Sequence, residues 1–241
     1  MKKKILVTCG SVINPMGNWP AFVINKDYMN AVLMNGGIPI LVGSNPFIED
    51  YAEMADGLII TGGESVHPRM FGETYENLAN RETEEVYRMR KDCDSARDEL
   101  DGALFEAFKQ KGKPILGICR GHQFINAVTG GKNMLNFPRL YGGEHNCGVV
   151  HEIIAEPDSV LGRLFGTKFK VNSYHCDCAV TPGPEMRVTA RSTDGIVESI
   201  EHVSLPIVGV QFHPERMRGN TPNPMLGPNM DVLFRDFIEK C

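Results

Sequence analysis

The chain has 241 residues, of which 42% are hydrophobic and 23% are charged, so its composition is that of a globular protein and excludes a disordered, collagen-like or coiled-coil one. It carries 25 lysines and arginines against 30 aspartates and glutamates, and a net charge of −5 gives no sign of a nucleic acid or an anionic membrane as partner. No apolar run approaches the roughly 20 residues that a membrane-spanning helix needs.

The first residues and the cysteines indicate a cytoplasmic protein. Three lysines at the start could open a secretory signal, but the apolar run that follows ends after Val7, short of the roughly 7–15 residues of a signal core. The seven cysteines are odd in number and scattered, in a chain long enough to fold without cross-links. We therefore expect reduced thiols and a cytoplasmic location.

In chain order, the first half alternates short apolar runs with helical segments. We predict strands over residues 4–8, 38–42, 57–61 and 114–118, and helices over residues 26–35, 95–111 and 122–129. The helix over 95–111 is indicated by apolar residues three or four positions apart, from Leu100 to Phe108. Apolar strands that alternate with helices predict a mostly parallel sheet covered on both faces.

The second half predicts shorter and closely spaced strands, followed by one helix. The strands fall over residues 149–154, 169–171, 186–190, 196–200 and 207–210, and the helix over residues 231–240. Such spacing favours antiparallel additions to the sheet. Residues 64–98 fit neither pattern, and we interpret this charged stretch as a lid over a site. Because no repeat or linker interrupts the chain, the simplest organisation is one domain over residues 1–241.

The sharpest local motif is Gly117-Ile-Cys119-Arg-Gly121, between a predicted buried strand and a predicted helix. It has the nucleophile-elbow pattern with cysteine in the serine position. The abrupt turn forces a strained backbone on Cys119, and the glycines remove side chains that would collide. The sulfur would lie at a strand's carboxyl end and a helix N-terminus, which favours thiolate, and the backbone N–H of Arg120 could bind an oxyanion. The alternative is a buried structural cysteine between packing glycines.

A catalytic thiolate needs a base, and His213 is the best candidate among the seven histidines. It follows a predicted strand and lies in the sequence His213-Pro-Glu215. Alternate residues of an extended segment face the same side, so Glu215 can orient the imidazole while the intervening proline stiffens the pair. The alternative is an ordinary turn after a strand.

Two other groups of residues have plainer interpretations. Cys176-Asp-Cys178, beside His175, lacks the usual zinc spacing, so we expect ordinary thiols near a pocket mouth in preference to a metal site or a redox pair. Arg97 and Asp98 are expected to form an ion pair that braces the helix before the nucleophile strand.

Joined together, these motifs resemble the class I glutamine amidotransferase-like superfamily. Gly117 to Gln123 matches its G-x-C-x-G-x-Q motif, and the order of the cysteine and the His-Pro-Glu motif also fits. Within that superfamily the chain is most similar, nearly end to end, to the γ-glutamyl-γ-aminobutyrate hydrolase (peptidase C26-type) family. The segments that carry this resemblance are residues 61–73, 96–101, 119–123 and 171–175.

The resemblance implies an α/β fold, a flavodoxin-like three-layer sandwich whose mostly parallel central sheet has antiparallel additions in the second half. It also implies a Cys-His-Glu triad of Cys119, His213 and Glu215. In that mechanism the cysteine attacks a γ-glutamyl amide, the histidine protonates the leaving amine, and water cleaves the γ-glutamyl thioester. The residues implied to bind the oxyanion or the substrate are Gly62, Gly63, Arg120, Gln123, Ser173, Tyr174 and His175. No metal and no cofactor are implied.

The sequence departs from that family's pattern where we expect substrate selection. Glu64 and Phe71 replace residues that are usually of the aspartate type and tyrosine. For a hydrolase that acts alone, we expect His67, Arg69 and Arg97 to be available for a carboxylate on the amine part of the substrate.

Three functions stay open at this point. The first is a hydrolase that acts alone on a small-molecule γ-glutamyl substrate. The second is a glutaminase subunit that delivers ammonia to a separate synthase, although the chain holds no P-loop motif. The third is a non-catalytic binding module, which the complete set of nucleophile, base and acid argues against. A homodimer also stays open.

Overall fold

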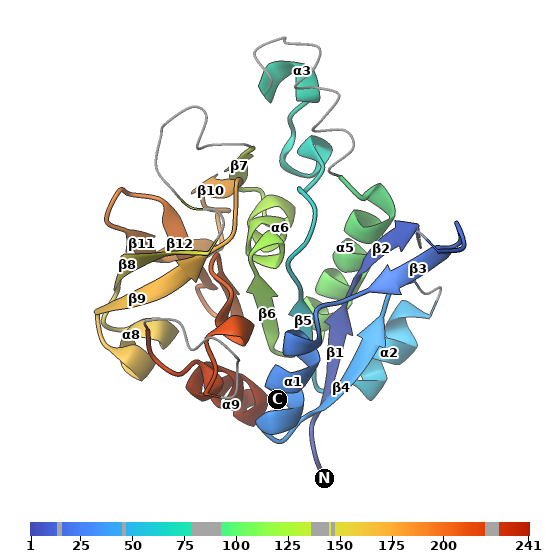
Figure 1. Cartoon of the computed structure of the whole chain (residues 1–241), viewed down its shortest axis with the longest axis horizontal. Coiled ribbons are helices and arrows are strands. Elements are labelled where there is room, and N and C mark those ends of the chain that lie inside the picture. The colour runs from blue at the N-terminus through green and yellow to red at the C-terminus, as the bar shows by residue number, and fades with distance from the viewer. Residues whose placement is uncertain (14–15, 45–46, 79–92, 136–144, 146–147, 220–226) are drawn as a thin grey trace.

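The computed structural model describes residues 1–13, 16–44, 47–78, 93–135, 145, 148–219 and 227–241. Within these residues one nine-stranded sheet runs through both halves of the chain, in the order β4-β1-β5-β6-β13-β12-β11-β8-β9 (Figure 1). The strands that run parallel are β4 (Ile38–Val42), β1 (Lys4–Thr8), β5 (Gly57–Ile60), β6 (Ile115–Ile118) and β13 (Ile207–Val210). The antiparallel additions are β12 (Val197–His202), β11 (Met186–Ser192), β8 (Val149–Ala155) and β9 (Lys168–Ser173).

The predicted α/β fold is confirmed, including the change from parallel to antiparallel strands. Strand β13 marks that change, because it runs parallel to β6 and antiparallel to β12. Every residue of β5 and β6 is buried, as expected for strands with helices on both faces.

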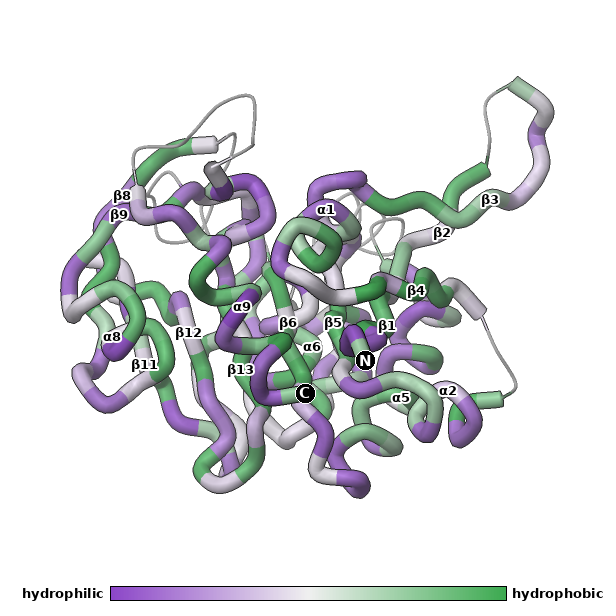
Figure 2. Tube along the Cα trace, turned by 90° about the horizontal axis from the view of Figure 1, so that it is seen from below, coloured by the Kyte–Doolittle hydropathy of each residue, from purple (hydrophilic) through white to green (hydrophobic). Residues whose placement is uncertain are grey.

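Helices cover the two faces of the sheet and enclose two hydrophobic cores (Figure 2). The helices of one face are α1 (Lys26–Met34), α8 (Val160–Phe165) and α9 (Asp231–Lys240), and those of the other are α2 (Ile48–Met54), α5 (Ser95–Gln110) and α6 (Arg120–Val128). Helix α5 forms because Leu100, Leu104 and Phe108 repeat every fourth residue and are all buried. Its N-terminus is capped by Asp94, whose carboxylate accepts the Arg97 N–H at 3.1 Å.

Several elements lie outside the sequence predictions. A hairpin of β2 (Gly10–Ile13) and β3 (Pro20–Val23) stands away from the main sheet (Figure 1). A second small pair joins β7 (Lys132–Met134) to β10 (Cys178–Thr181), and α2 and α8 were also not predicted. They are short, so hydrophobic periodicity had few residues on which to act.

The stretch from 64 to 98, which we interpreted as a lid, is described only in part. It contains η1 (Pro68–Phe71) and α3 (Tyr75–Leu78), and a bridge pairs Ser65 with Cys93. Residues 79–92, the middle of that stretch, lie outside the described residues. Among the helices that the structure describes, none has the length and hydrophobicity needed to cross a membrane.

Candidate active site

Cys119 lies at the turn between β6 and α6, as the elbow motif predicted. Its backbone adopts φ 54° and ψ −105°, a strained conformation for a residue with a side chain. A Cβ on Gly121 would come within 2.0 Å of the Ile60 carbonyl oxygen, and one on Gly117 within 2.5 Å of the Gly121 oxygen. Both glycines are therefore required by close backbone approaches, and the turn presents the sulfur beyond the carboxyl end of β6.

His213 and Glu215 follow β13, the neighbour of the nucleophile strand in the sheet. The Nδ1 atom of His213 lies 2.6 Å from Oε1 of Glu215, and both side chains are buried. Cys119 lies beside this pair and acts electrostatically on His213. The structure therefore brings together the three residues that the sequence put forward as a triad.

The electrostatics of this group favour a charged imidazole. Burial by itself would lower the pKa of His213, but the negative charges of Glu215 and Cys119 outweigh burial and raise the pKa to about 10. At neutral pH the histidine therefore carries a proton beside the sulfur, which is an arrangement that stabilises a thiolate.

Asn172, on β9, fixes the backbone of His213 from the other side. Its Nδ2 donates to the His213 carbonyl at 2.9 Å, and its Oδ1 accepts the His213 N–H at 2.8 Å. The ring of Tyr174 lies edge-on to the imidazole with 5.6 Å between centroids. Asn172 belongs to the segment 171–175 that carried the family resemblance, but the sequence offered no sign of its partner.

The glycine turn after β5 lies against the same group. A Cβ on Gly62 would meet His213 Cε1 at 3.0 Å and the Cβ of Cys119 at 3.4 Å, so the turn, Cys119 and His213 are neighbours. The Gly62 N–H donates to the hydroxyl of Tyr28 at 3.0 Å. Burial, followed by the charges of Glu215 and Cys119, raises the pKa of Tyr28 well above its usual value, so its phenol stays protonated.

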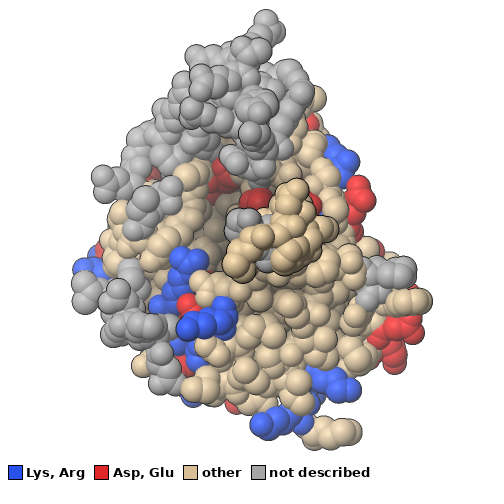
Figure 3. Space-filling model, turned by 45° about the vertical axis from the view of Figure 1, so that its right-hand side comes forward, with Lys and Arg blue, Asp and Glu red and all other residues tan. Residues whose placement is uncertain are grey.

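A cavity of about 190 Å³ opens at this site, and its lining includes Tyr28, Gly62, Gly63, His213 and Arg216. Figure 3 shows that the molecule is hollowed on the side drawn there, with acidic side chains in the wall of the hollow. A larger cavity of about 590 Å³ lies where β6 and β13 begin, and Pro114, Pro206 and Leu233 are in its lining. It holds none of the predicted site residues, whereas Gly62, Gly63 and His213 line the smaller cavity.

A family model described as Peptidase C26 matches residues 11–215, most of the chain. The chain belongs to the Peptidase C26 family. It is 30% identical over 237 residues to gamma-glutamyl-gamma-aminobutyrate hydrolase PuuD of Escherichia coli (strain K12), covering 90% of this chain and 86% of that protein. It is also 30% identical over 202 residues to protein NtpR of Enterococcus hirae, covering 79% of this chain and 80% of that protein.

Two solved structures show the same fold. The glutaminase domain of Trypanosoma brucei CTPS with bound acivicin superposes with a TM-score of 0.63 at 13% identity, over 99% of this chain and 94% of that one. A glutamine amidotransferase from Thermotoga maritima gives 0.54 at 16% identity, over 89% and 77%. With the family match, these findings make this Peptidase C26 member a glutamine amidotransferase-like hydrolase.

Arg97 and Asp98 of this Peptidase C26 protein do not pair with each other, which corrects the sequence prediction. Arg97 Nη2 donates to Thr61 O at 2.9 Å and to Gly62 O at 3.1 Å, and its Nη1 lies 3.1 Å from Glu64 Oε2. Arg120 instead takes Asp98, with Nη2 2.5 Å from Oδ1. Arg97 therefore binds the turn after β5, and Asp98 binds an arginine of helix α6 in place of its neighbour in the sequence.

Arg97 is also not available for a substrate carboxylate, because its side chain is only 2% exposed and already holds the glycine turn. Arg69 is exposed and pairs with Glu99 at 3.0 Å. His67 accepts the Arg69 N–H as the cap of η1. Of the two departures from the family pattern, Glu64 lines the cavity but Phe71 is buried in a hydrophobic core. Only Glu64 is therefore placed to affect a ligand.

The other residues predicted to bind the oxyanion or the substrate lie on helix α6 and at the end of β9. The side chain of Arg120 is fully buried and points to the acids of α5, while its backbone begins α6 directly after Cys119. Gln123, one turn later, donates from Nε2 to the Asp177 carbonyl at 2.8 Å. Ser173 Oγ donates to the His145 carbonyl at 2.6 Å, so Ser173 and His175 face a group of histidines and Tyr174 faces His213.

The cysteines near His175 behave as thiols. Cys178 is buried, and burial, with the charges of Asp177 and Glu198, raises its pKa to about 12. Cys176 is partly exposed, and both are free cysteines. A thiol that stays protonated is a poor metal ligand and a poor nucleophile. Cys178 therefore offers no second nucleophile.

Proposed function

We propose that the protein hydrolyses the γ-glutamyl amide bond of small γ-glutamyl amines through a γ-glutamyl thioester on Cys119. The observation that carries the proposal is the His213–Glu215 contact of 2.6 Å beside a cysteine held at φ 54° on the elbow. A buried base with its own carboxylate, next to a nucleophile at a helix N-terminus, suits acyl transfer.

In the first half of the reaction the Cys119 thiolate attacks the γ-carbonyl carbon of the substrate. The carbonyl oxygen becomes an oxyanion, for which the N–H groups of Arg120 and of the glycine turn are the donors. Because the Gly62 N–H bonds to Tyr28 in the free protein, an oxyanion there would take the place of the Tyr28 hydroxyl. His213 then protonates the amine nitrogen, the C–N bond breaks, and the glutamyl group remains on sulfur.

In the second half water replaces the amine. The now neutral His213 takes a proton from water, and the resulting hydroxide attacks the thioester carbon. The C–S bond breaks, glutamate leaves, and the thiolate returns beside the imidazolium. Glu215 keeps the imidazole in one tautomer and stabilises its charge in both halves.

A second cationic group of the cavity suits a substrate that carries a carboxylate. Arg216 lines the cavity, is 31% exposed and lies with its guanidinium carbon 4.4 Å from the centre of the Tyr174 ring. A guanidinium is planar, so a ring that orients it also orients the parallel N–H donors that fit a carboxylate. We therefore assign carboxylate binding to Arg216 in place of Arg97, whose donors are already occupied.

The deciding experiment compares γ-glutamyl-γ-aminobutyrate with glutamine on the purified protein alone, by release of glutamate. We expect a kcat/KM at least tenfold higher for the γ-glutamyl amine. A denaturing quench followed by mass spectrometry should find a glutamyl adduct on Cys119, and Cys119→Ala should show neither adduct nor turnover. Full turnover by Cys119→Ala would refute the mechanism.

The second candidate is a glutaminase subunit of a separate synthase. It is favoured by the likeness in fold to the glutaminase domain of Trypanosoma brucei CTPS. It requires that glutamine be the best substrate and that a second protein accelerate its hydrolysis. That outcome of the same experiment would replace the first proposal.

A further inference from the structure

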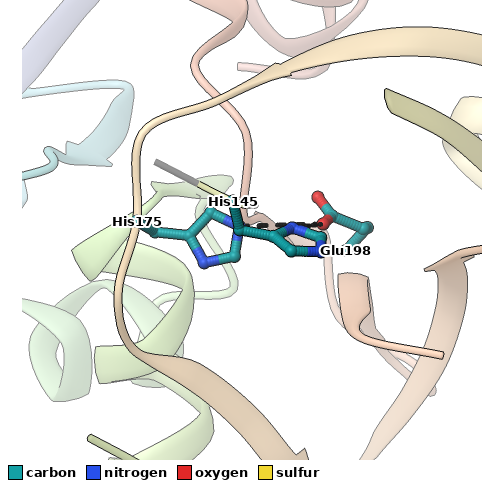
Figure 4. A group of neighbouring side chains, drawn as sticks. All are labelled: His145, His175 and Glu198. Carbon is teal, nitrogen blue, oxygen red and sulfur yellow. Dashed lines mark ion pairs between the residues drawn. The ribbon is translucent and has the colours of Figure 1, made fainter. Parts of the chain in front are cut away.

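A group of three histidines and one glutamate lies in the antiparallel half of the sheet. The ligand-type atoms of His145, His175 and Glu198 are all within 4.8 Å of one another, and the two imidazoles face the carboxylate in Figure 4. His145 Nδ1 and His175 Nε2 each lie 3.7 Å from Glu198 Oε1, and His151 Nε2 lies 3.0 Å from the same oxygen. His145, His175 and Glu198 thus lie together, and His151 contacts the same carboxylate oxygen.

The outer nitrogens of two of these rings have partners that define their tautomers. His175 Nδ1 donates to the Asp177 carbonyl at 2.9 Å, and His145 Nε2 donates to the Asp194 carboxylate at 2.9 Å. A neutral ring whose proton is on the outer nitrogen presents a lone pair from the inner one. Carboxylate or carbonyl partners of this kind typically orient histidines that bind a metal.

The two inner nitrogens face the Glu198 carboxylate at 3.7 Å, a distance too long for a hydrogen bond. Neither oxygen of Glu198 has a hydrogen-bond donor in good geometry among the described residues, although His151 is close. The ring centroid of His145 lies 4.6 Å from that of His151 and 5.1 Å from that of His175. The Glu198 side chain is 0% exposed and those of His145 and His175 only 3% and 1%, so water has little access to these groups.

We propose that His145, His151, His175 and Glu198 bind a Zn²⁺ ion in a closed four-ligand site. Ligands about 2.1 Å from a tetrahedral ion lie roughly 3.4 Å apart, and the distances of 3.0 Å and 3.7 Å to Glu198 bracket that separation. Three imidazoles and one carboxylate suit this ion. Its positive charge would lie between the imidazole nitrogens and the carboxylate that they face. The proposal departs from the sequence analysis, which expected no metal.

The position of the site indicates a stabilising role. Its ligands come from β8, β12, the end of β9 and the segment at His145, whose carbonyl accepts from Ser173 Oγ and from the His175 N–H. The Glu198 carbonyl accepts the N–H of Gln211, two residues before His213. With four protein ligands no position is left for substrate, so the ion would tie the antiparallel strands to the strand that carries the base.

The test uses the Cys119→Ala protein, so that the nucleophile cannot supply a ligand. After treatment with a chelator, this protein is titrated with Zn²⁺ by calorimetry and melted with and without the ion. We expect one ion per chain and a rise in Tm of roughly 5–10 °C at a 100-fold excess over Kd. Co²⁺ in place of Zn²⁺ should show the intense visible absorption of a four-coordinate ion, without sulfur-to-metal charge transfer.

Variants of two ligands locate the site. In the same background, His151→Ala and Glu198→Gln should each weaken Zn²⁺ binding by at least about 100-fold. The matched control is His202→Asn on the same strand as Glu198, which keeps an acceptor for the Ser204 N–H and should bind Zn²⁺ as before. If a variant fails to fold, the titration and the Co²⁺ spectrum of the parent protein still decide. The proposal would be overturned if the parent protein did not bind Zn²⁺, or if both ligand variants bound Zn²⁺ as tightly as the parent. A Co²⁺ spectrum with sulfur-to-metal charge transfer would also overturn it.

Discussion

Cys119, the proposed nucleophile, is buried and has a strained backbone. Its φ of 54° lies in a region that costs side-chain-bearing residues about 1–3 kcal/mol. The neighbouring backbone maintains this conformation, since the Cys119 N–H donates to the Val210 carbonyl at 2.8 Å. The surrounding strands therefore hold the turn, and the sulfur itself contributes little to its shape.

It follows that Cys119→Ala should remove turnover and leave the fold intact. We expect kcat/KM to fall by at least about 1,000-fold, because no other described group can form the thioester. The Tm should change by no more than about 2 °C, since alanine keeps the Cβ at the same turn. Cys176→Ser and Cys178→Ser serve as controls and should keep substantial activity without added metal.

The raised pKa of His213 makes a second prediction at the residue scale. Burial opposes the charged ring, and the charges of Glu215 and Cys119 raise its pKa to about 10. Glu215→Gln removes one of these charges, so the pKa of His213 should fall. The histidine then loses its proton at lower pH, and the alkaline limb of the kcat/KM profile should move to lower pH. A limb at the same pH in both proteins would show that the carboxylate has no influence on the base.

Arg216 provides a third test at this scale. Arg216→Gln should raise KM for γ-glutamyl-γ-aminobutyrate about tenfold and change kcat much less, because the contact is to a non-reacting part of the substrate. Arg216→Lys should restore part of the loss, since it keeps the charge without the planar donors. Glutamine, whose amine part has no carboxylate, should be affected less. An equal effect on both substrates would place the arginine at their shared glutamyl part.

At the scale of elements, Arg97 of α5 holds the turn that follows β5. Its guanidinium donates to the Thr61 hydroxyl and carbonyl and to the Gly62 carbonyl. It is also 3.6 Å from Asp101, which in turn pairs with Arg120 of α6. The position of the turn therefore depends on two helices at once.

Arg97→Lys should lower the free energy of unfolding by about 1–3 kcal/mol, because the turn loses hydrogen-bond donors while the charge stays. It should also lower kcat by displacing the Gly62 N–H. Chemical denaturation and steady-state kinetics would measure the two effects. Arg69→Lys is the matched control, since the Arg69 side chain is 47% exposed and its replacement should cost less than about 0.5 kcal/mol.

Strand β9 acts on the base through Asn172, which exchanges two hydrogen bonds with the His213 backbone. Asn172→Ala should therefore lower kcat by about 10- to 100-fold with little change in KM, because a displaced imidazole affects proton transfer and not substrate binding. The pH limb assigned to His213 should stay in place, since its charged neighbours are unchanged. A loss of stability with normal kcat would mean that the clamp serves only the fold.

At the scale of the whole molecule, the β2–β3 hairpin is a separate two-stranded sheet that stands away from the nine-stranded one (Figure 1). Its strands pair with each other, and its large apolar side chains Ile13, Trp19 and Phe22 are 60%, 53% and 53% exposed. An exposed apolar surface of this kind is typical of a site that another protein covers. The homodimer that the sequence left open stays a prediction, and this hairpin is the surface that we expect it to use.

Sedimentation velocity over a range of concentrations tests that expectation. The protein should self-associate, and the double variant Trp19→Ser, Phe22→Ser should remain monomeric. Leu33→Ser, on helix α1 with 53% exposure, is the control and should associate as the parent does. A monomer at every concentration would leave the hairpin without this role.

The sequence by itself determined the features whose chemistry is local along the chain. The parallel strands, helix α5, the elbow at Cys119 and the pair His213 and Glu215 all follow from periodicity, glycine spacing or near neighbours. Only the tertiary structure decided which groups meet across the sheet. Arg97 was assigned the wrong partner because its actual acceptor Thr61 lies 36 residues away, and the ligand-like group around Glu198 has no spacing that a motif could reveal. The physical reason is that strand order and helix packing, which no local pattern specifies, bring such distant side chains together.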